Sequence, residues 1–346
     1  MGVWLKRHSG IVPYALLAPG ILWLVVFYVL PSIQMFISSF WSGSLETGFT
    51  FSFDNYTNYT DALNQYAPFY GRSIVYAAAA TLLTFLISYP LAYAIAFKGG
   101  AQKNLLLFLV VAPFFTSFLL RTISWKLILS DGGFIVSVIN VILSPLVFIG
   151  VLPHDLHIRL LATPIAVIAG ITYNFLPFMT LPIYVALEKV DIRLIEAAKD
   201  LYAGPWRPGG GIAGAIFGGV LAAVLGVIFE WNPIAMAAVG ALVGAVIGWF
   251  LISESFVRVT FPLSLPGVFA GSLLTFIPAI GDYVNAEFLG NPNTRMIGNV
   301  IQNKFLTEND YPTAAALSFM LMAGVLVVVA VYARVLGTED VSTGRL

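Results

Sequence analysis

Stretches of about twenty predominantly apolar residues dominate this sequence and set the strongest limit on its fold. Such a stretch forms a helix long enough to cross a bilayer, where every backbone polar group needs a partner within its own segment. Eight candidate spans follow in chain order: residues 14–36, 73–97, 105–120, 162–187, 211–229, 234–252, 262–280 and 313–335. The sequence therefore predicts an all-α, polytopic integral membrane protein.

The composition agrees with this class and excludes several others. Of the 346 residues, 59% are hydrophobic and 10% are charged, whereas about 25% are charged in soluble domains. The formal net charge is zero, so the basic footprint of a nucleic-acid-binding protein is missing. With no cysteine and three scattered histidines, we expect no metal centre, no cofactor and no enzymatic reaction in this chain.

The loops between the candidate spans differ in positive charge, and this difference predicts the orientation. With the N-terminus inside, the inner loops carry eleven Lys and Arg residues and the outer loops carry six. Positive residues favour cytoplasmic loops. We therefore expect both termini in the cytoplasm, long external loops at 41–72 and 281–312, and an interfacial or short helix within 131–159.

One polar loop, residues 194–262, is interrupted by 47 apolar residues at 208–254, hereafter the insert. Without the insert, the loop reads E-A-A-x3-Y-x6-F-x2-V-x-F-P. This string resembles the EAA loop of the membrane subunits of binding-protein-dependent ABC importers, whose pattern is E-A-A-x3-G-x6-F-x2-I-x-L-P. The main departure is Tyr202 where the family has glycine, and we expect Gly204 with Pro205 to form the tight turn two residues later.

Strings outside the insert resemble the spermidine/putrescine branch of these importers, at residues 113–122, 173–178, 281–284 and 296–299. The resemblance implies a six-helix permease core in a prokaryotic cell membrane, which moves a polyamine or similar small solute inward by alternating access. It also implies separate ATPase subunits, a second homologous permease subunit or a second copy of this chain, and an extracytoplasmic binding protein. The sequence has no GxxxxGK[ST] phosphate-binding loop, so ATP must be bound by a partner.

The resemblance assigns ATPase docking to a short helix at the start of the interrupted loop. In such a helix, small residues enter a groove of the partner while charged residues line its rim. The residues implied are Glu196, Ala197, Ala198, Lys199, Asp200, Tyr202 and Gly204.

Small residues recur four positions apart in both apolar segments of the insert, a pattern that lets membrane helices approach closely. We expect an antiparallel hairpin with Trp231 near its outer tip, packed through Gly214, Gly218, Gly226, Gly240, Gly244 and Gly248. The chain then divides into a permease core, residues 1–207 and 255–346, and the insert at 208–254. Two interpretations of the insert remain open: a passive addition, or a hairpin that contacts a neighbouring subunit or limits the movement of the loop.

Polar side chains within the spans or at their ends are rare and are candidates for the solute path: Arg121, Trp125, Tyr173, Asn174, Asp282 and Tyr283. Arg121 and Trp125 are one helical turn apart and can form a cation–π pair. For an ammonium solute, the carboxylate of Asp282 and the aromatic faces are suitable contacts. Alternatively, Asp282 caps a helix or meets the binding protein.

Two functions of other classes stay open. An ion-coupled secondary transporter would need membrane-buried Asp, Glu or His and inverted repeats, which the nearly charge-free spans do not favour. A non-transporting membrane scaffold would have no use for a loop that matches the importer pattern at both of its ends.

Overall fold

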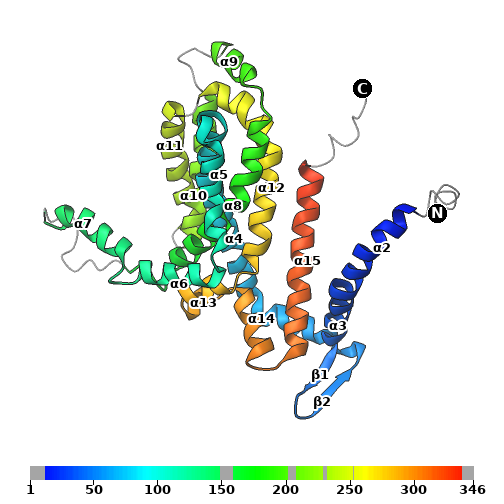
Figure 1. Ribbon diagram of the computed structural model, residues 1–346. Helices are drawn as coiled ribbons and strands as arrows, with labels where there is room; N and C mark the ends of the chain where they lie inside the picture. The colour runs from blue at the N-terminus through cyan, green and yellow to red at the C-terminus, as the bar shows by residue number, and fades with distance from the viewer. Residues whose placement is uncertain (1–11, 149–158, 202–207, 229–231, 252, 337–346) are drawn as a thin grey trace. The chain divides into compact units, whose positions relative to one another are not determined.

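The computed structural model describes residues 12–148, 159–201, 208–228, 232–251 and 253–336 (Figure 1). Within these residues the chain is helical apart from one antiparallel hairpin, β1 (Trp41–Ser44) with β2 (Gly48–Phe51). The longer helices are α2 (Val12–Leu24), α3 (Leu30–Ser38), α4 (Thr57–Lys98), α5 (Lys103–Val111), α6 (Phe118–Leu129), α7 (Phe134–Phe148), α8 (Pro164–Glu188), α9 (Ile192–Leu201), α10 (Pro208–Ile228), α11 (Pro233–Leu251), α12 (Phe261–Ile280), α13 (Val284–Leu289), α14 (Ile297–Leu306) and α15 (Tyr311–Leu336). Short 3-10 or π turns join them: η1 (Val25–Val29), η2 (Phe53–Tyr56), η3 (Gly100–Gln102), η4 (Ala112–Phe115), η5 (Phe256–Thr260) and η6 (Pro292–Thr294).

Six stretches of the described residues are long and apolar enough to cross a membrane: Leu16–Ser38, Phe53–Lys98, Phe118–Val141, Pro164–Glu188, Phe256–Ile280 and Tyr311–Arg334. All six overlap spans predicted from the sequence, Phe118–Val141 at its first three residues alone, and the all-α, polytopic fold class is confirmed. The two helices of the insert are also apolar, but their apolar stretches, Gly209–Val224 and Pro233–Val246, are shorter than the six above. A full membrane crossing by each of them stays a prediction.

The expected third span, residues 105–120, is wrong as a single helix. The chain leaves the helical region at Thr116 and Ser117, where ψ is 149° and 136°. Pro113 has no backbone N–H to donate within a helix, and its carbonyl oxygen accepts the Thr116 hydroxyl at 2.6 Å, which stabilises the turn. α6 then crosses the end of the bundle instead of continuing along α5 (Figure 1).

Some sequence-based expectations concern residues outside the described part. They include the turn at Gly204 and Pro205 and the hairpin tip at Trp231. α7 is a short helix within the segment 131–159 where one is expected, although residues 149–158 are not described.

The chain packs as two compact units, residues 1–67 with 300–346 and residues 68–299. The smaller unit joins α3, the β-hairpin and α15. The hydroxyl of Tyr59 lies 2.6 Å from that of Ser39, and the rings of Phe36 and Phe319 meet edge to face at 5.3 Å. These two units do not correspond to the permease core and the insert that the sequence predicts, and that division stays a prediction.

In the larger unit, α8 and α12 form the central pair. Two glycines on α12 allow the close approach, because a Cβ at Gly267 would lie 2.4 Å from the carbonyl oxygen of Pro182 and one at Gly271 would lie 2.8 Å from the Met179 sulfur. α4 packs against this pair through a buried cluster: Phe85, Tyr89, Ala92, Ile95, Met179, Ile183, Tyr184, Leu187 and Val268.

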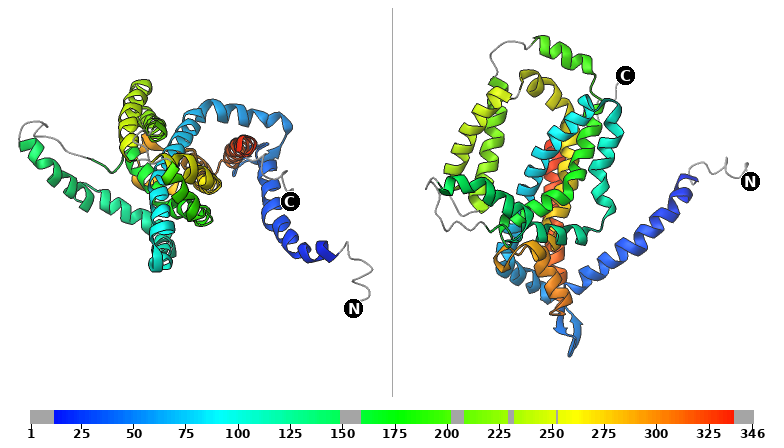
Figure 2. Two further views of the ribbon diagram at one scale, coloured as in Figure 1. Left: turned by 90° about the horizontal axis from the view of Figure 1, so that it is seen from above. Right: turned by 60° about the vertical axis from the view of Figure 1, so that its left-hand side comes forward.

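The insert forms two helices, α10 and α11, that lie side by side in both views (Figures 1 and 2). Their backbones approach at the glycine rows. A Cβ at Gly214 would lie 2.0 Å from the Gly244 carbonyl oxygen, and one at Gly218 would lie 2.2 Å from that of Gly240. Gly248 faces the backbone of α10 and Gly226 faces that of α11. The order of these contacts makes the pair antiparallel.

Candidate functional site

α9 is an amphipathic helix that begins soon after α8 ends. Asp191 caps its start by accepting the backbone N–H of Arg193 at 2.9 Å. Ile195 and Ala198, three positions apart, are 4% and 5% exposed and form the inner face. The remaining residues of α9 are exposed, so the helix presents a free surface at one end of the larger unit.

Among the residues that the resemblance assigns to ATPase docking, four are exposed: Glu196, Ala197, Lys199 and Asp200. Ala198 instead faces inward, and Tyr202 and Gly204 lie outside the described residues.

Sequence analysis missed two residues of this surface, Leu194 and Leu201, which are 53% and 75% exposed. Together with Ala197 they recur at intervals of three and four and therefore share one side of α9, which we call the docking face. The motif leaves both leucine positions unspecified. Their large apolar side chains in an otherwise charged loop were the feature of the sequence that could have indicated this surface.

The far end of the interrupted loop forms the π-helical turn η5, and α9 packs against it. η5 continues into α12 without a break, because Phe261 keeps right-handed helical angles, φ −65° and ψ −49°. Since α12 packs along α8, the elements α9, η5, α12 and α8 form one continuous series of contacts. Contacts through η5 thus connect α9 with the central helix pair.

A buried polar cluster lies at the opposite end of the larger unit, where α6, α8 and α13 meet (Figure 1). Asp282 accepts the backbone N–H of Asn285 at 2.9 Å and its side-chain amide at 2.6 Å. The amide oxygen of Asn285 accepts from Asn174 at 3.1 Å and from the Thr122 hydroxyl at 3.3 Å. All four residues are at most 7% exposed. Asp282 and Asn174 are thus brought together, through two residues that the sequence did not single out.

Asp282 is the ionisable residue of this cluster, and it lies just beyond the span Phe256–Ile280. Burial raises the pKa of its carboxyl, and the two hydrogen bonds from Asn285 oppose that rise. The bond from the backbone N–H of Asn285 holds Asp282 against the first turn of α13, next to the N-cap residue Tyr283. The second bond, from the Asn285 side chain, connects the carboxylate to α8 as well.

Arg121 and Trp125, both candidates for the solute path, do not form the expected cation–π pair with each other. The guanidinium of Arg121 lies over the rings of Phe114 and Phe118, at 4.9 and 5.8 Å, instead of pairing with Trp125. Trp125 meets Tyr173 edge to face at 5.4 Å. The difference follows from the break after Phe115, which turns Phe114 toward the start of α6.

Arg121 is 9% exposed, and its Nε and Nη1 atoms have no hydrogen-bond partner among the described residues. Tyr283 is 42% exposed, and its carbonyl oxygen accepts the Asn299 side-chain amide at 2.9 Å. Within the described residues, no group of three or more His, Asp or Glu is placed to hold a metal ion.

Comparisons with known proteins match both the sequence and the fold. Residues 252–336 match the family described as the binding-protein-dependent transport system inner membrane component. The matched range begins within two residues of the expected end of the insert at Glu254. A crystal structure of a bacterial ABC transporter involved in import of the acidic polysaccharide alginate shares the fold, with TM-score 0.59, 17% identity and coverage of 97% of this chain and 98% of that chain.

Two curated relatives extend the match to most of the chain. The spermidine/putrescine transport system permease protein PotB of Haemophilus influenzae is 32% identical over 314 residues, 90% of each chain. PotB of Escherichia coli K12 is 31% identical over 315 residues, covering 90% of this chain and 93% of the relative. At this identity and coverage, the chain belongs to the PotB-like permeases, multi-pass inner-membrane components of binding-protein-dependent ABC transport systems.

Proposed function

We propose that this chain is a transmembrane subunit of an ABC importer for polyamines such as spermidine and putrescine. The observation that carries the proposal is the 31–32% identity to spermidine/putrescine permeases over nine-tenths of the chain. The chain would pair with a second permease subunit or with itself, receive solute from an extracytoplasmic binding protein, and depend on separate ATPase subunits.

The docking face of α9 supports the expectation of an ATPase partner. It offers Leu194, Ala197 and Leu201 to an apolar groove, while Glu196 and Lys199 lie beside it for pairing at the rim. In this proposal, ATP-driven closure of the partner moves α9, and the contacts through η5 carry that movement to α12 and α8. Alternating access follows from tilting this central pair. α9 and both termini are then cytoplasmic, as the Lys and Arg count predicts.

The opposite end of the same helices supports a role in solute passage. A protonated amine is attracted by a carboxylate and by aromatic faces, and Asp282, Tyr283, Tyr173 and Trp125 lie around the junction of α6, α8 and α13. The positive charge of Arg121 is held over Phe114 and Phe118, which reduces its repulsion of a passing cation.

Reconstitution tests the proposal. The chain, its co-encoded permease, ATPase and binding protein are placed in proteoliposomes, and uptake of radiolabelled spermidine and putrescine is measured. We expect uptake that requires ATP and the binding protein and persists without an ion gradient. Uptake driven by an ion gradient alone would identify a secondary transporter, and absence of uptake with every tested polyamine would contradict the proposed solute class.

A further inference from the structure

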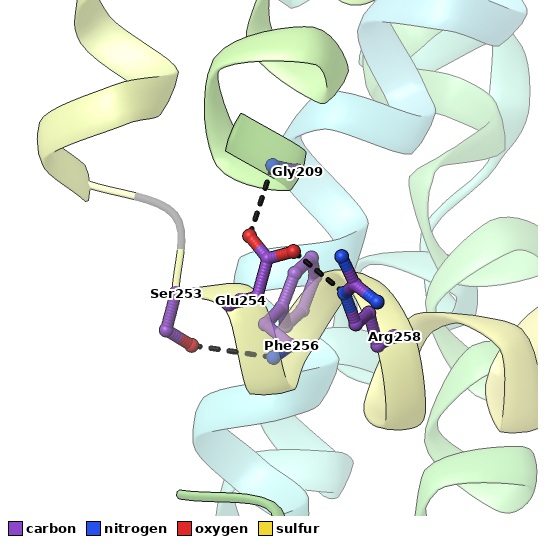
Figure 3. Close-up of polar contacts among 5 residues, drawn as sticks. All are labelled: Gly209, Ser253, Glu254, Phe256 and Arg258. Atoms are coloured by element: carbon purple, nitrogen blue, oxygen red, sulfur yellow. Dashed lines mark hydrogen bonds and ion pairs between the residues drawn. The ribbon is translucent and has the colours of Figure 1, made fainter. Parts of the chain in front are cut away.

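The two ends of the insert are joined by one buried carboxylate (Figure 3). Glu254, the last residue of the insert, accepts the backbone N–H of Gly209 at 2.9 Å through one oxygen. Its other oxygen accepts the Arg258 Nε at 2.6 Å. Gly209 belongs to the first turn of α10, and Arg258 belongs to η5. The side chain of Glu254 is 5% exposed, while that of Arg258 is 55% exposed.

The local sequence is adapted to this contact. A Cβ at position 209 would lie 2.8 and 2.9 Å from the two carboxylate oxygens, so the carboxylate in this position packs directly against the backbone of Gly209. Burying a carboxylate is unfavourable unless it is paired and hydrogen-bonded, and both of its oxygens are satisfied here. The N-terminus of α10 also favours a negative charge at this place.

Aromatic contacts extend the connection from the insert to the permease core. Phe217 on α10 stacks on Phe85 of α4 at 5.4 Å and meets Phe261 at 6.4 Å. Phe256, the first residue of η5, meets Tyr89 of α4 edge to face at 5.4 Å. The insert therefore packs against α4 and α12, and its base contacts η5, the turn against which α9 also packs.

We propose that Glu254 is a positioning residue that binds the insert to the docking loop, so that α10, α11 and η5 move as one body when α9 is displaced. The inference rests on the proposed function and goes beyond it, because it assigns the insert a mechanical role in coupling. Without the contact, η5 would move independently of the insert, and part of the displacement of α9 would be lost before it reaches α12.

The test measures solute transported per ATP hydrolysed in proteoliposomes that contain the full complex, with radiolabelled spermidine as the probe. Glu254→Ala removes both hydrogen bonds of the carboxylate and is expected to lower this ratio at least about tenfold, the change in a conformational equilibrium that follows from losing even one charge-assisted hydrogen bond. Glu254→Gln keeps one acceptor and should restore part of the ratio. Ser253→Ala is the matched control, because it removes the side-chain hydroxyl that accepts the backbone N–H of Phe256 in the same turn and leaves the carboxylate contacts in place.

Removing residues 208–254 takes away Glu254 together with the insert that it holds, so that η5 again moves without the insert, and that variant should lower the ratio as Glu254→Ala does. A wild-type complex that imports spermidine, combined with an unchanged ratio in Glu254→Ala, would overturn the inference and leave the proposed function standing. A wild-type complex that imports none would contradict the proposed function itself. The ratio separates this role from a merely structural one, since loss of folded protein lowers uptake and hydrolysis together.

Discussion

The side-chain amide of Asn174 on α8 donates to the side-chain oxygen of Asn285 on α13 at 3.1 Å, across 111 positions of sequence. Asn285 also supplies both donors to Asp282, so this one residue joins α13 to the central helix pair. It is fully buried.

Asn285→Ala should therefore be strongly destabilising. It removes the side-chain donor to Asp282 and the acceptor that Asn174 and Thr122 share, in a place that water does not reach, and we expect the free energy of unfolding to fall by about 3 kcal/mol. Thermal unfolding of the purified protein in detergent measures the change. Asn293→Ala, at an exposed position nearby, is the control, and equal stability of the two variants would contradict the importance of the cluster.

Asp282→Asn should impair polyamine uptake and leave assembly and ATPase stimulation intact. The substitution removes the negative charge that would attract an ammonium group, whereas the docking face lies at the far end of the unit (Figure 1). Initial rates of spermidine uptake over a range of concentrations check this. Transport kinetics equal to those of the wild type would remove Asp282 from the solute path.

The same variant should also change how stability depends on pH. Burial raises the folded-state pKa of Asp282 above its usual 3.8, so the folded state holds the proton more tightly than the unfolded state does. The resulting stabilisation is complete below pH 3.8 and is lost as pH rises through the folded-state pKa. In Asp282→Asn this loss should disappear. Melting temperatures of both proteins across the acidic range give the comparison, and parallel curves would argue against a raised pKa.

Ala197→Trp should prevent ATPase binding without unfolding the permease. Ala197 lies between Leu194 and Leu201 on the exposed side of α9, where a bulky ring would block entry into a partner's groove. Co-purification of the ATPase subunit measures the effect, and we expect at least a tenfold loss, equivalent to about 1.4 kcal/mol. Glu46→Trp, on an exposed loop elsewhere, should bind normally. Normal ATPase recovery with Ala197→Trp would show that docking uses another surface.

Gly244→Val should force α10 and α11 apart, because even a Cβ at that position would lie 2.1 Å from the Gly214 carbonyl oxygen. Overpacking of this kind costs about 1–3 kcal/mol. The cysteine-free sequence allows a direct measurement, since cysteines placed by Gly219→Cys and Ala241→Cys face each other and should form a disulfide. Its yield should fall with Gly244→Val and stay unchanged with Gly324→Val, where no atom lies within 4 Å.

Much of the fold could be predicted because membrane spans are encoded locally, in runs of apolar residues. The wrong prediction of a single helix over residues 105–120 shows what hydropathy alone does not reveal. Hydropathy continues smoothly through Pro113, and only the backbone at Thr116 and Ser117 reveals that the chain turns there. That turn then placed Arg121 over Phe114, a contact that helical spacing from Arg121 to Trp125 did not predict.

The candidate sites show the same division between local and long-range information. α9 could be located because its motif is contiguous, and its cap and inner face follow from residues 191–198 alone. The cluster around Asp282 could be identified in part, from rare polar residues in apolar surroundings. Its organising residues, Asn285 and Thr122, belong to ordinary polar stretches and become significant only when tertiary packing buries them.

The contact between Gly209 and Glu254 also makes the base of the insert a place where one pair of helices could be exchanged for another. The positions where the chain leaves the loop and returns to it are neighbours in space, so another pair of helices whose own ends meet at the same spacing could replace residues 208–254. In a sequence that contains no cysteine, a single labelled cysteine on such a pair would report the movement of the loop from within the membrane-embedded subunit itself.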